Sequence, residues 1–161
     1  MEANLKIAVL NGPNINFLGK REIGVYGDKT YDELCTEIKK ESNILGIHVE
    51  IFQSNSEGEL IDIVQKCYGK TDFIIANLGA YTHTSIALRD AFLAVKIPFI
   101  EVHISNVFAR DDFRHKSYFS DIAEGVISGF GTYSYILALK AAKTFLLPDS
   151  CSKKTGEGHN R

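Results

Sequence analysis

Glu101 and His103 have the residue types and the spacing needed to move a proton, and they end an apolar run. Because side chains alternate along a strand, residues two apart lie on the same face. A carboxylate beside an imidazole can orient the ring or stabilise its charged form. The pair therefore predicts a histidine that works as an acid or base, although a buried structural pair has the same pattern.

Arg21 and Tyr26 lie in a long, glycine-containing connection from Ile15 to Lys29. Free tyrosine has a pKa of about 10, so a tyrosine that acts as a base at neutral pH needs a partner that stabilises the phenolate. A guanidinium such as that of Arg21 is suitable. The glycines of this connection are typical of lid hinges. In the alternative interpretation, Tyr26 covers an edge of the core and Arg21 is solvated.

His83 and Arg114 are two further candidates. His83 opens a helical pattern beside threonine and serine residues of the kind that cap helices. Arg114 lies in the mixed-charge run 110–116, where it is either solvated or a bidentate clamp for a substrate carboxylate. A metal ion held by His83 and His103 would lack a clear third ligand, so no metal site is predicted.

Uncharged amides and hydroxyls follow the other apolar runs, at 11–14, at 53–55 and at 77–79. Such groups suit a polyhydroxylated ligand better than a triphosphate, and neither a GxxxxGK[ST] loop nor a GxGxxG loop is present after the first run. A phospho-acceptor receiver domain needs carboxylates where this chain has Asn11 and Asn77. A GxSxG nucleophile elbow is also missing. These absences exclude several familiar chemistries.

The composition is that of an ordinary globular protein. The chain has 161 residues, with 18 lysines and arginines against 20 aspartates and glutamates, for a formal charge of −2. This balance favours neither nucleic acid nor an acidic tail, and no segment approaches the roughly 18 continuous apolar residues of a membrane span. The start of the sequence lacks a signal-peptide pattern. Three cysteines without a CxxC spacing predict a reduced, cytoplasmic protein.

Short apolar runs alternate with helical patterns along the chain. The predicted strands are Leu5–Leu10, Val49–Gln53, Phe73–Ala76, Phe99–His103 and Gly125–Ser128. Helices are predicted at about 30–46, 56–69, 83–95 and 132–147, the first two with capping-box spacing at their starts. This order predicts an α/β fold, a flavodoxin-like three-layer sandwich with a five-stranded parallel sheet, whose ligands bind beyond the carboxyl ends of the strands.

One domain is expected, over residues 1–148. The segment 149–161 is rich in Ser, Lys, Thr, Gly and Asn, a composition that is typical of a disordered tail.

Several separated motifs together resemble the type II 3-dehydroquinate dehydratases. The matching segments are Asn11–Asn14, Leu18–Glu22, Tyr26–Gly27, Gln53–Gly58, Asn77–Ser85, Ile100–Asn106 and Arg110–Ser117. The likeness covers nearly everything from Leu5 to Leu146. It implies a subunit that dehydrates 3-dehydroquinate to 3-dehydroshikimate in the shikimate or quinate route. The implied reaction is an anti elimination through an enolate, without a Schiff base, metal or organic cofactor.

The resemblance also implies catalytic roles. Tyr26 is the base that removes the proton next to the ketone, and Arg21 favours the phenolate form of that tyrosine. His103 is the acid that protonates the departing hydroxyl, with Glu101 as its orienting partner. Asn14 holds a water or amide contact that stabilises the enolate oxygen.

Substrate-binding positions follow from the same resemblance. They are Asn77, His83, Ile104, Ser105 and Arg114, together with Asp90 from a neighbouring subunit. Members of the family commonly assemble as dodecamers of four trimers, so a homo-oligomer is expected. Two alternatives stay open: a non-catalytic binding or assembly protein with the same fold, and a different cofactor-free hydrolase or isomerase.

Overall fold

The fold is built around a five-stranded sheet with the order β2-β1-β3-β4-β5, in a computed structural model that describes residues 4–20 and 23–147. All four strand pairings are parallel. The strands are β1 (Leu5–Asn11), β2 (Ile47–Gln53), β3 (Phe73–Asn77), β4 (Phe99–His103) and β5 (Gly125–Ser128). The predicted sheet is confirmed, and β2 begins two residues earlier than predicted, because buried Ile47 already pairs with Leu5.

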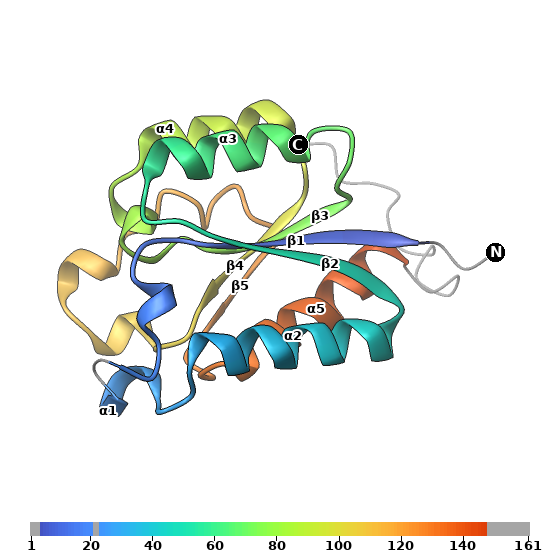
Figure 1. The fold of residues 1–161 in the computed structure, drawn as a ribbon. Helices are drawn as coiled ribbons and strands as arrows, with labels where there is room; N and C mark the ends of the chain where they lie inside the picture. The colour runs from blue at the N-terminus through green and yellow to red at the C-terminus, as the bar shows by residue number, and fades with distance from the viewer. Residues whose placement is uncertain (1–3, 21–22, 148–161) are drawn as a thin grey trace, which may run out of the picture.

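Helices cover both faces of this sheet, with α3 and α4 on one side and α2 and α5 on the other (Figure 1). These four helices are α2 (Tyr31–Leu45), α3 (Glu57–Cys67), α4 (Ile86–Val95) and α5 (Tyr133–Leu146), and the short α1 (Ile23–Tyr26) lies beyond the end of the sheet (Figure 1). The three-layer α/β prediction is therefore confirmed. The connection from Ile15 to Lys29, predicted as a long loop, contains α1 and the short 3-10 helix Ile15–Phe17.

Local capping explains where the helices begin and end. The capping box of Thr30 and Glu33 is complete, and Gly46 ends α2 with φ 69°, a conformation that favours glycine. Ser56 caps α3 through the Glu59 amide, but the Glu59 carboxylate instead accepts a hydrogen bond from Ser54. The second box is thus only half formed.

The start predicted for the third long helix, near His83, is wrong by about one turn. The Ser85 side chain accepts a hydrogen bond from the Leu88 amide and caps α4, which begins at Ile86. His83 belongs to the preceding 3-10 helix, Gly79–His83. Because of this shift, His83 lies in a turn beyond the end of β3 and not on the helix itself.

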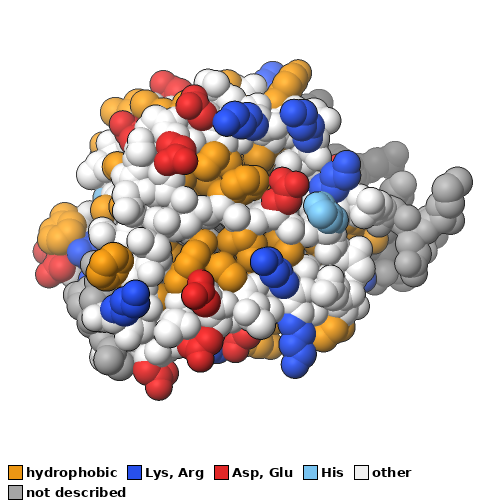
Figure 2. Space-filling view, viewed as in Figure 1, with side chains coloured by type: hydrophobic (Ala, Val, Ile, Leu, Met, Phe, Trp, Pro, Cys, Tyr) orange, Lys and Arg blue, Asp and Glu red, His pale blue; other side chains and the backbone are white. Residues whose placement is uncertain are grey.

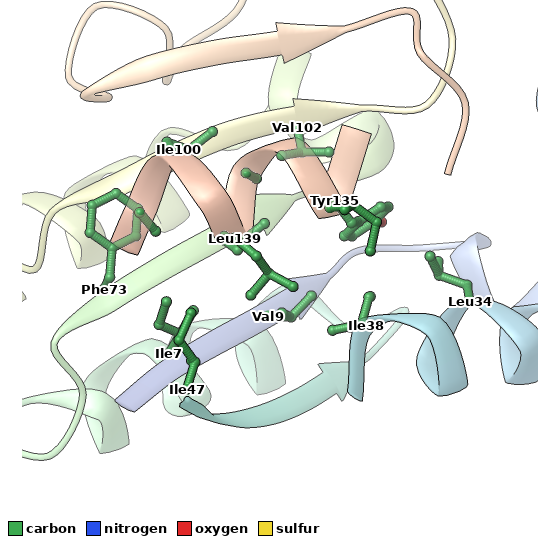
Figure 3. Packing of buried hydrophobic residues seen from close by; sticks show 14 of the residues in the cluster. Ile7, Val9, Leu34, Ile38, Ile47, Phe73, Ile100, Val102, Tyr135 and Leu139 are labelled. Carbon is green, nitrogen blue, oxygen red and sulfur yellow. The ribbon is translucent and has the colours of Figure 1, made fainter. Parts of the chain in front are cut away.

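Alternate residues of β1 pack on opposite faces of the sheet. Ile7 and Val9 contribute to the cluster under α2 and α5, which Figure 3 shows from close by. Ala8 and Leu10 contribute to the cluster under α3 and α4. Burial on both faces is what a parallel sheet covered by two helical layers requires.

The surface shown in Figure 2 mixes charges of both signs, with hydrophobic side chains gathered near its centre. In the described chain, no helix is long and apolar enough to cross a membrane. The tail predicted over 149–161 lies outside the described residues.

Candidate active site

A cavity of about 120 Å³ lies where strands β1, β3 and β4 end. It is lined by Asn14, Ile15, Tyr26, Asn77, Gly79, Ala80, His83, His103, Ile104, Ser105, Val107, Arg110 and Arg114. Chain order reverses between β1 and β3, and ligands bind at such a switch point in open parallel sheets. The structure therefore brings most of the predicted site residues to one place.

The loop after β1 is locked onto the loop after β3. The Gly12 amide donates to the Asn77 carbonyl at 2.8 Å, and a Cβ on Gly12 would stand only 2.2 Å from the Leu78 carbonyl oxygen. Asn14 then adopts φ 67°, a left-handed conformation that asparagine tolerates better than most residues. Its backbone amide donates to Asn55. This close approach holds Asn14 at the rim of the cavity.

A buried hydrogen-bond chain fixes the amide of Asn77. Its Nδ2 donates to the Tyr135 hydroxyl, and that hydroxyl donates to Asn11 Oδ1, both at 2.7 Å. Burial raises the pKa of Tyr135, so its hydroxyl stays protonated and can donate. Asn77 lines the cavity while part of its amide is used inside the protein, and its predicted contact with substrate stays a prediction.

Glu101 and His103 lie side by side, as their spacing predicts, and share a buried hydrogen bond. His103 Nε2 lies 2.6 Å from Glu101 Oε1, and the two residues are only 7% and 3% exposed. Burial, the largest effect, acts to raise the pKa of Glu101, but hydrogen bonds from His103 and two serines outweigh it and the pKa is lowered. Because a carboxylate only accepts, Nε2 carries the hydrogen. Nδ1 is then the ring nitrogen that can exchange a proton with a ligand.

His83 lies beside this pair, with its ring nearly parallel to that of His103 and the centroids 6.4 Å apart. Its Nδ1 donates to the carbonyl oxygen of Lys116 at 2.7 Å, which leaves Nε2 as an acceptor in the neutral ring. Burial lowers the pKa of His83, opposed by the Lys116 hydrogen bond and aided by the charges of His103 and Arg114. A neutral His83 suits acceptance of a hydrogen bond from a ligand hydroxyl.

Tyr26 reaches the cavity from the end of α1. Arg110 Nη1 donates to its hydroxyl at 2.6 Å, and the guanidinium carbon lies 5.2 Å from the ring centroid. Arg110 also lies 3.5 Å from Ser105 Oγ. The sequence analysis placed Arg110 in a mixed-charge run and in a family-like segment, but gave it no role in the site. Arg21, the predicted partner of Tyr26, lies outside the described residues.

Arg114 presents its guanidinium to the same cavity. Its Nε lies 3.6 Å from Asp111 Oδ2 and has no hydrogen-bond partner in the described chain. Its Cζ stacks 4.9 Å from the Phe113 ring. A supported guanidinium with a donor to spare can bind a carboxylate. Asp90, in contrast, is exposed on α4 and does not line the cavity of its own chain.

Sequence reasoning missed Ser117 and Ser120 as well as Arg110. Both serine hydroxyls donate to Glu101 Oε2, at 3.0 and 2.6 Å. In the residues that the structure describes, no group of three or more His, Cys, Asp and Glu side chains could hold a metal ion.

The family model described as dehydroquinase class II matches residues 5–143. The chain belongs to this family. A protein of Aeromonas salmonicida named 3-dehydroquinate dehydratase is 54% identical over 142 residues, which are 88% of this chain and 95% of the relative. A protein of the same name from Prochlorococcus marinus is 51% identical over 142 residues, 88% of this chain and 98% of the relative.

Among solved structures, the type II dehydroquinase of Butyrivibrio crossotus superposes with a TM-score of 0.85 at 47% identity. The match covers 86% of this chain and 97% of that one. This class II dehydroquinase chain therefore shares its fold with a solved member of its family over nearly the whole of that member.

Proposed function

We propose that this protein is a 3-dehydroquinate dehydratase of the shikimate pathway, which eliminates water from 3-dehydroquinate to give 3-dehydroshikimate. The observation that carries the proposal is one cavity lined by a tyrosine and a histidine, each with a charged partner. Relatives at about 50% identity that bear this name support it. The reaction needs a base and an acid in one site, and these two side chains supply them.

Tyr26 is the base in this proposal. Its phenolate takes the proton from the carbon between the ketone and the carbon that carries the leaving hydroxyl. The electron pair of the broken C–H bond moves onto the ketone oxygen and forms an enolate. Arg110 stabilises the phenolate through its hydrogen bond, and Arg21 is proposed to share this role. Asn14, at the rim of the cavity, stabilises the enolate oxygen through an amide or water contact.

His103 is the acid of the second step. As the enolate collapses, the bond to the leaving hydroxyl breaks, and the imidazolium donates its Nδ1 proton so that water departs. A double bond conjugated with the ketone remains. Glu101 supports this step because its carboxylate accepts from Nε2 and stabilises the charged ring.

The remaining cavity residues are proposed to orient the substrate. His83 Nε2 accepts from a substrate hydroxyl, and Arg114 binds the carboxylate. Ile104 and Ser105 follow directly after β4 and contact the same ligand, with Asn77 on the side of β3. No metal or organic cofactor takes part in the proposed mechanism.

A homo-oligomer is also proposed, a dodecamer of four trimers in which Asp90 of one subunit approaches the site of another. Large hydrophobic side chains that a single chain leaves exposed are candidates for the contacts between subunits. They include Ile86, Leu93, Val126, Phe130, Tyr133 and Phe145. Light scattering during size exclusion tests this assembly, and a monomer would contradict it.

The proposed location is the cytoplasm, and the proposed catalytic domain is 1–148.

Deuterium labelling tests the proposed reaction and its stereochemistry together. The substrate carries deuterium on the reacting carbon, anti to the leaving hydroxyl. Loss of the label from 3-dehydroshikimate supports anti elimination, while a product that keeps the label contradicts it. Binding of 3-dehydroquinate without any product would favour the non-catalytic alternative.

A further inference from the structure

Ser117 and Ser120 contact Glu101, the partner of His103, and neither serine lines the cavity. We propose that these serines are positioning residues for His103: their hydroxyls hold Glu101 as a carboxylate aimed at the imidazole. The inference rests on the proposed function, since it concerns the acid of that reaction.

The two oxygens of Glu101 have separate partners. Oε1 lies 2.6 Å from His103 Nε2, while Oε2 accepts from Ser120 Oγ at 2.6 Å and from Ser117 Oγ at 3.0 Å. Hydrogen bonds to an ionised acceptor are shorter and stronger than neutral ones. Three donors on one buried carboxylate therefore fix both its charge and its rotation.

Local hydrogen bonds and a buried side chain hold the segment that carries the two serines. Ser117 Oγ accepts from the backbone amides of Phe119 and Ser120, at 3.0 and 3.1 Å. With its acceptor sites turned to these amides, the single hydroxyl hydrogen of Ser117 is directed to Glu101. Phe119 between them is fully buried in the cluster under α3 and α4, which anchors the turn. The serines are thus held in place by the backbone and by the core.

The surrounding charges explain why such support matters. His83, from the turn after β3, lies beside His103, and its pKa is lowered by burial and by the charges of His103 and Arg114, and raised by that of Glu101. A positive Arg114 disfavours a second proton on a nearby imidazole, whereas a carboxylate at Glu101 favours it. Burial works against the ionised form of Glu101, and the serine hydroxyls are among the groups that offset it. Loss of a serine hydroxyl should therefore make protonated His103 less stable.

The test uses the full chain with Ser120→Ala, the double variant Ser117→Ala with Ser120→Ala, and Ser120→Thr, which keeps a hydroxyl. Thr144→Ala removes an exposed hydroxyl from α5 and is the matched control. In Ser120→Ala, kcat should fall about threefold to tenfold with KM within twofold. The alkaline limb of the kcat profile should move to lower pH because the acid loses its proton earlier. Ser120→Thr should restore both, and the double variant should show the larger shift.

A second readout does not depend on turnover. The titration of ¹³C-labelled histidine, with the His103 signal assigned by its loss in His103→Asn, should move to lower pH in Ser120→Ala by about half a unit to one unit. An unchanged titration in the folded double variant would overturn the positioning role. If the titration shifts in the variants but the unchanged protein does not turn over 3-dehydroquinate, the positioning role is supported and the proposed function is contradicted. The two failures are therefore distinguishable.

Discussion

Arg110 and Tyr26 meet at the cavity although 84 positions separate them along the chain, with Arg110 Nη1 only 2.6 Å from the tyrosine hydroxyl. A guanidinium is always charged and cannot accept a proton, so it stabilises a phenolate more than a phenol. The contact joins α1 to the loop after β4 and places the proposed base beside a guanidinium. Arg110 therefore supplies in this structure the kind of support that sequence reasoning expected from Arg21.

Replacement of Arg110 by methionine should slow turnover and shift its pH dependence. We expect kcat to fall by about a hundredfold, in the range for the loss of a charged hydrogen bond at a reacting group. The acidic limb of the kcat profile should move to higher pH, because the phenolate loses a counter-ion. Asp112→Asn, on an exposed residue of the same run, is the control. An unchanged acidic limb in this variant would contradict the proposal that Arg110 stabilises the phenolate of Tyr26.

Tyr26→Phe removes the hydroxyl and leaves the ring. Turnover should fall by about a hundredfold to ten-thousandfold, the usual contribution of a positioned general base. Because Tyr26 is only half-buried, circular dichroism and assembly should match the unchanged protein. Isothermal calorimetry should still detect binding of 3-dehydroquinate. Near-normal turnover of this variant is the outcome that would refute Tyr26 as the base.

Glu101→Gln tests the pKa of the buried carboxyl through stability. In the folded state the pKa of Glu101 is lowered, so the carboxylate stabilises the fold above the unfolded pKa of about 4.3 and loses this effect as the pH falls below it. The free energy of unfolding in urea should therefore differ most between the two proteins at neutral pH. The difference should shrink toward pH 3. A difference that grows on acidification would contradict the lowered pKa.

Tyr135→Phe should destabilise the fold through the two asparagines that its hydroxyl joins. Without that hydroxyl, Asn77 Nδ2 and Asn11 Oδ1 lose their buried partner. An unsatisfied buried polar group costs about 1–3 kcal/mol. Tyr133→Phe on the same helix is the matched control, because Tyr133 is 53% exposed. Urea unfolding measures both, and equal stabilities for the two variants would contradict a structural role for the chain of hydrogen bonds.

Gly12→Ala should destabilise the loops that border the cavity, because the added methyl group has no room. Its Cβ would meet the Leu78 carbonyl oxygen at 2.2 Å, so the two loops must separate. We expect a loss of stability of about 1–3 kcal/mol, as for overpacked sites, and weaker substrate binding. Gly58→Ala, on α3 with nothing within 4 Å of the added carbon, should instead gain up to about 1 kcal/mol. A tolerated Gly12→Ala would show that the loops can separate at little cost.

Local signals in the sequence predicted most of the fold. Apolar runs and the Thr30 cap depend on neighbouring residues alone, so they predict where strands and helices lie. In the same way, the spacing of Glu101 and His103 predicts that both lie on one face of a strand. The start of α4 was predicted too early because several threonines and serines near 82–85 are equally plausible caps, and only the fold shows that Ser85 fills the role. Such choices depend on contacts beyond the local pattern.

The site was predicted less completely, and the missing parts are long-range contacts. Arg110 reaches Tyr26 across 84 positions, and Ser120 reaches Glu101 across 19. Neither spacing has a periodicity that a strand or helix would impose. A charged run such as 110–116 is typical of a solvated surface until the loop is seen to fold over the cavity.

The most direct measurement follows the ultraviolet absorbance of the conjugated enone when the purified full-length protein is mixed with 3-dehydroquinate. One sample contains a metal chelator, and another has been treated with borohydride in the presence of substrate. We predict a rapid rise in absorbance that survives both treatments and is lost in Tyr26→Phe. No rise from a folded, assembled protein would contradict the proposed dehydratase activity, and a rise abolished by borohydride would contradict the enolate route in favour of an imine.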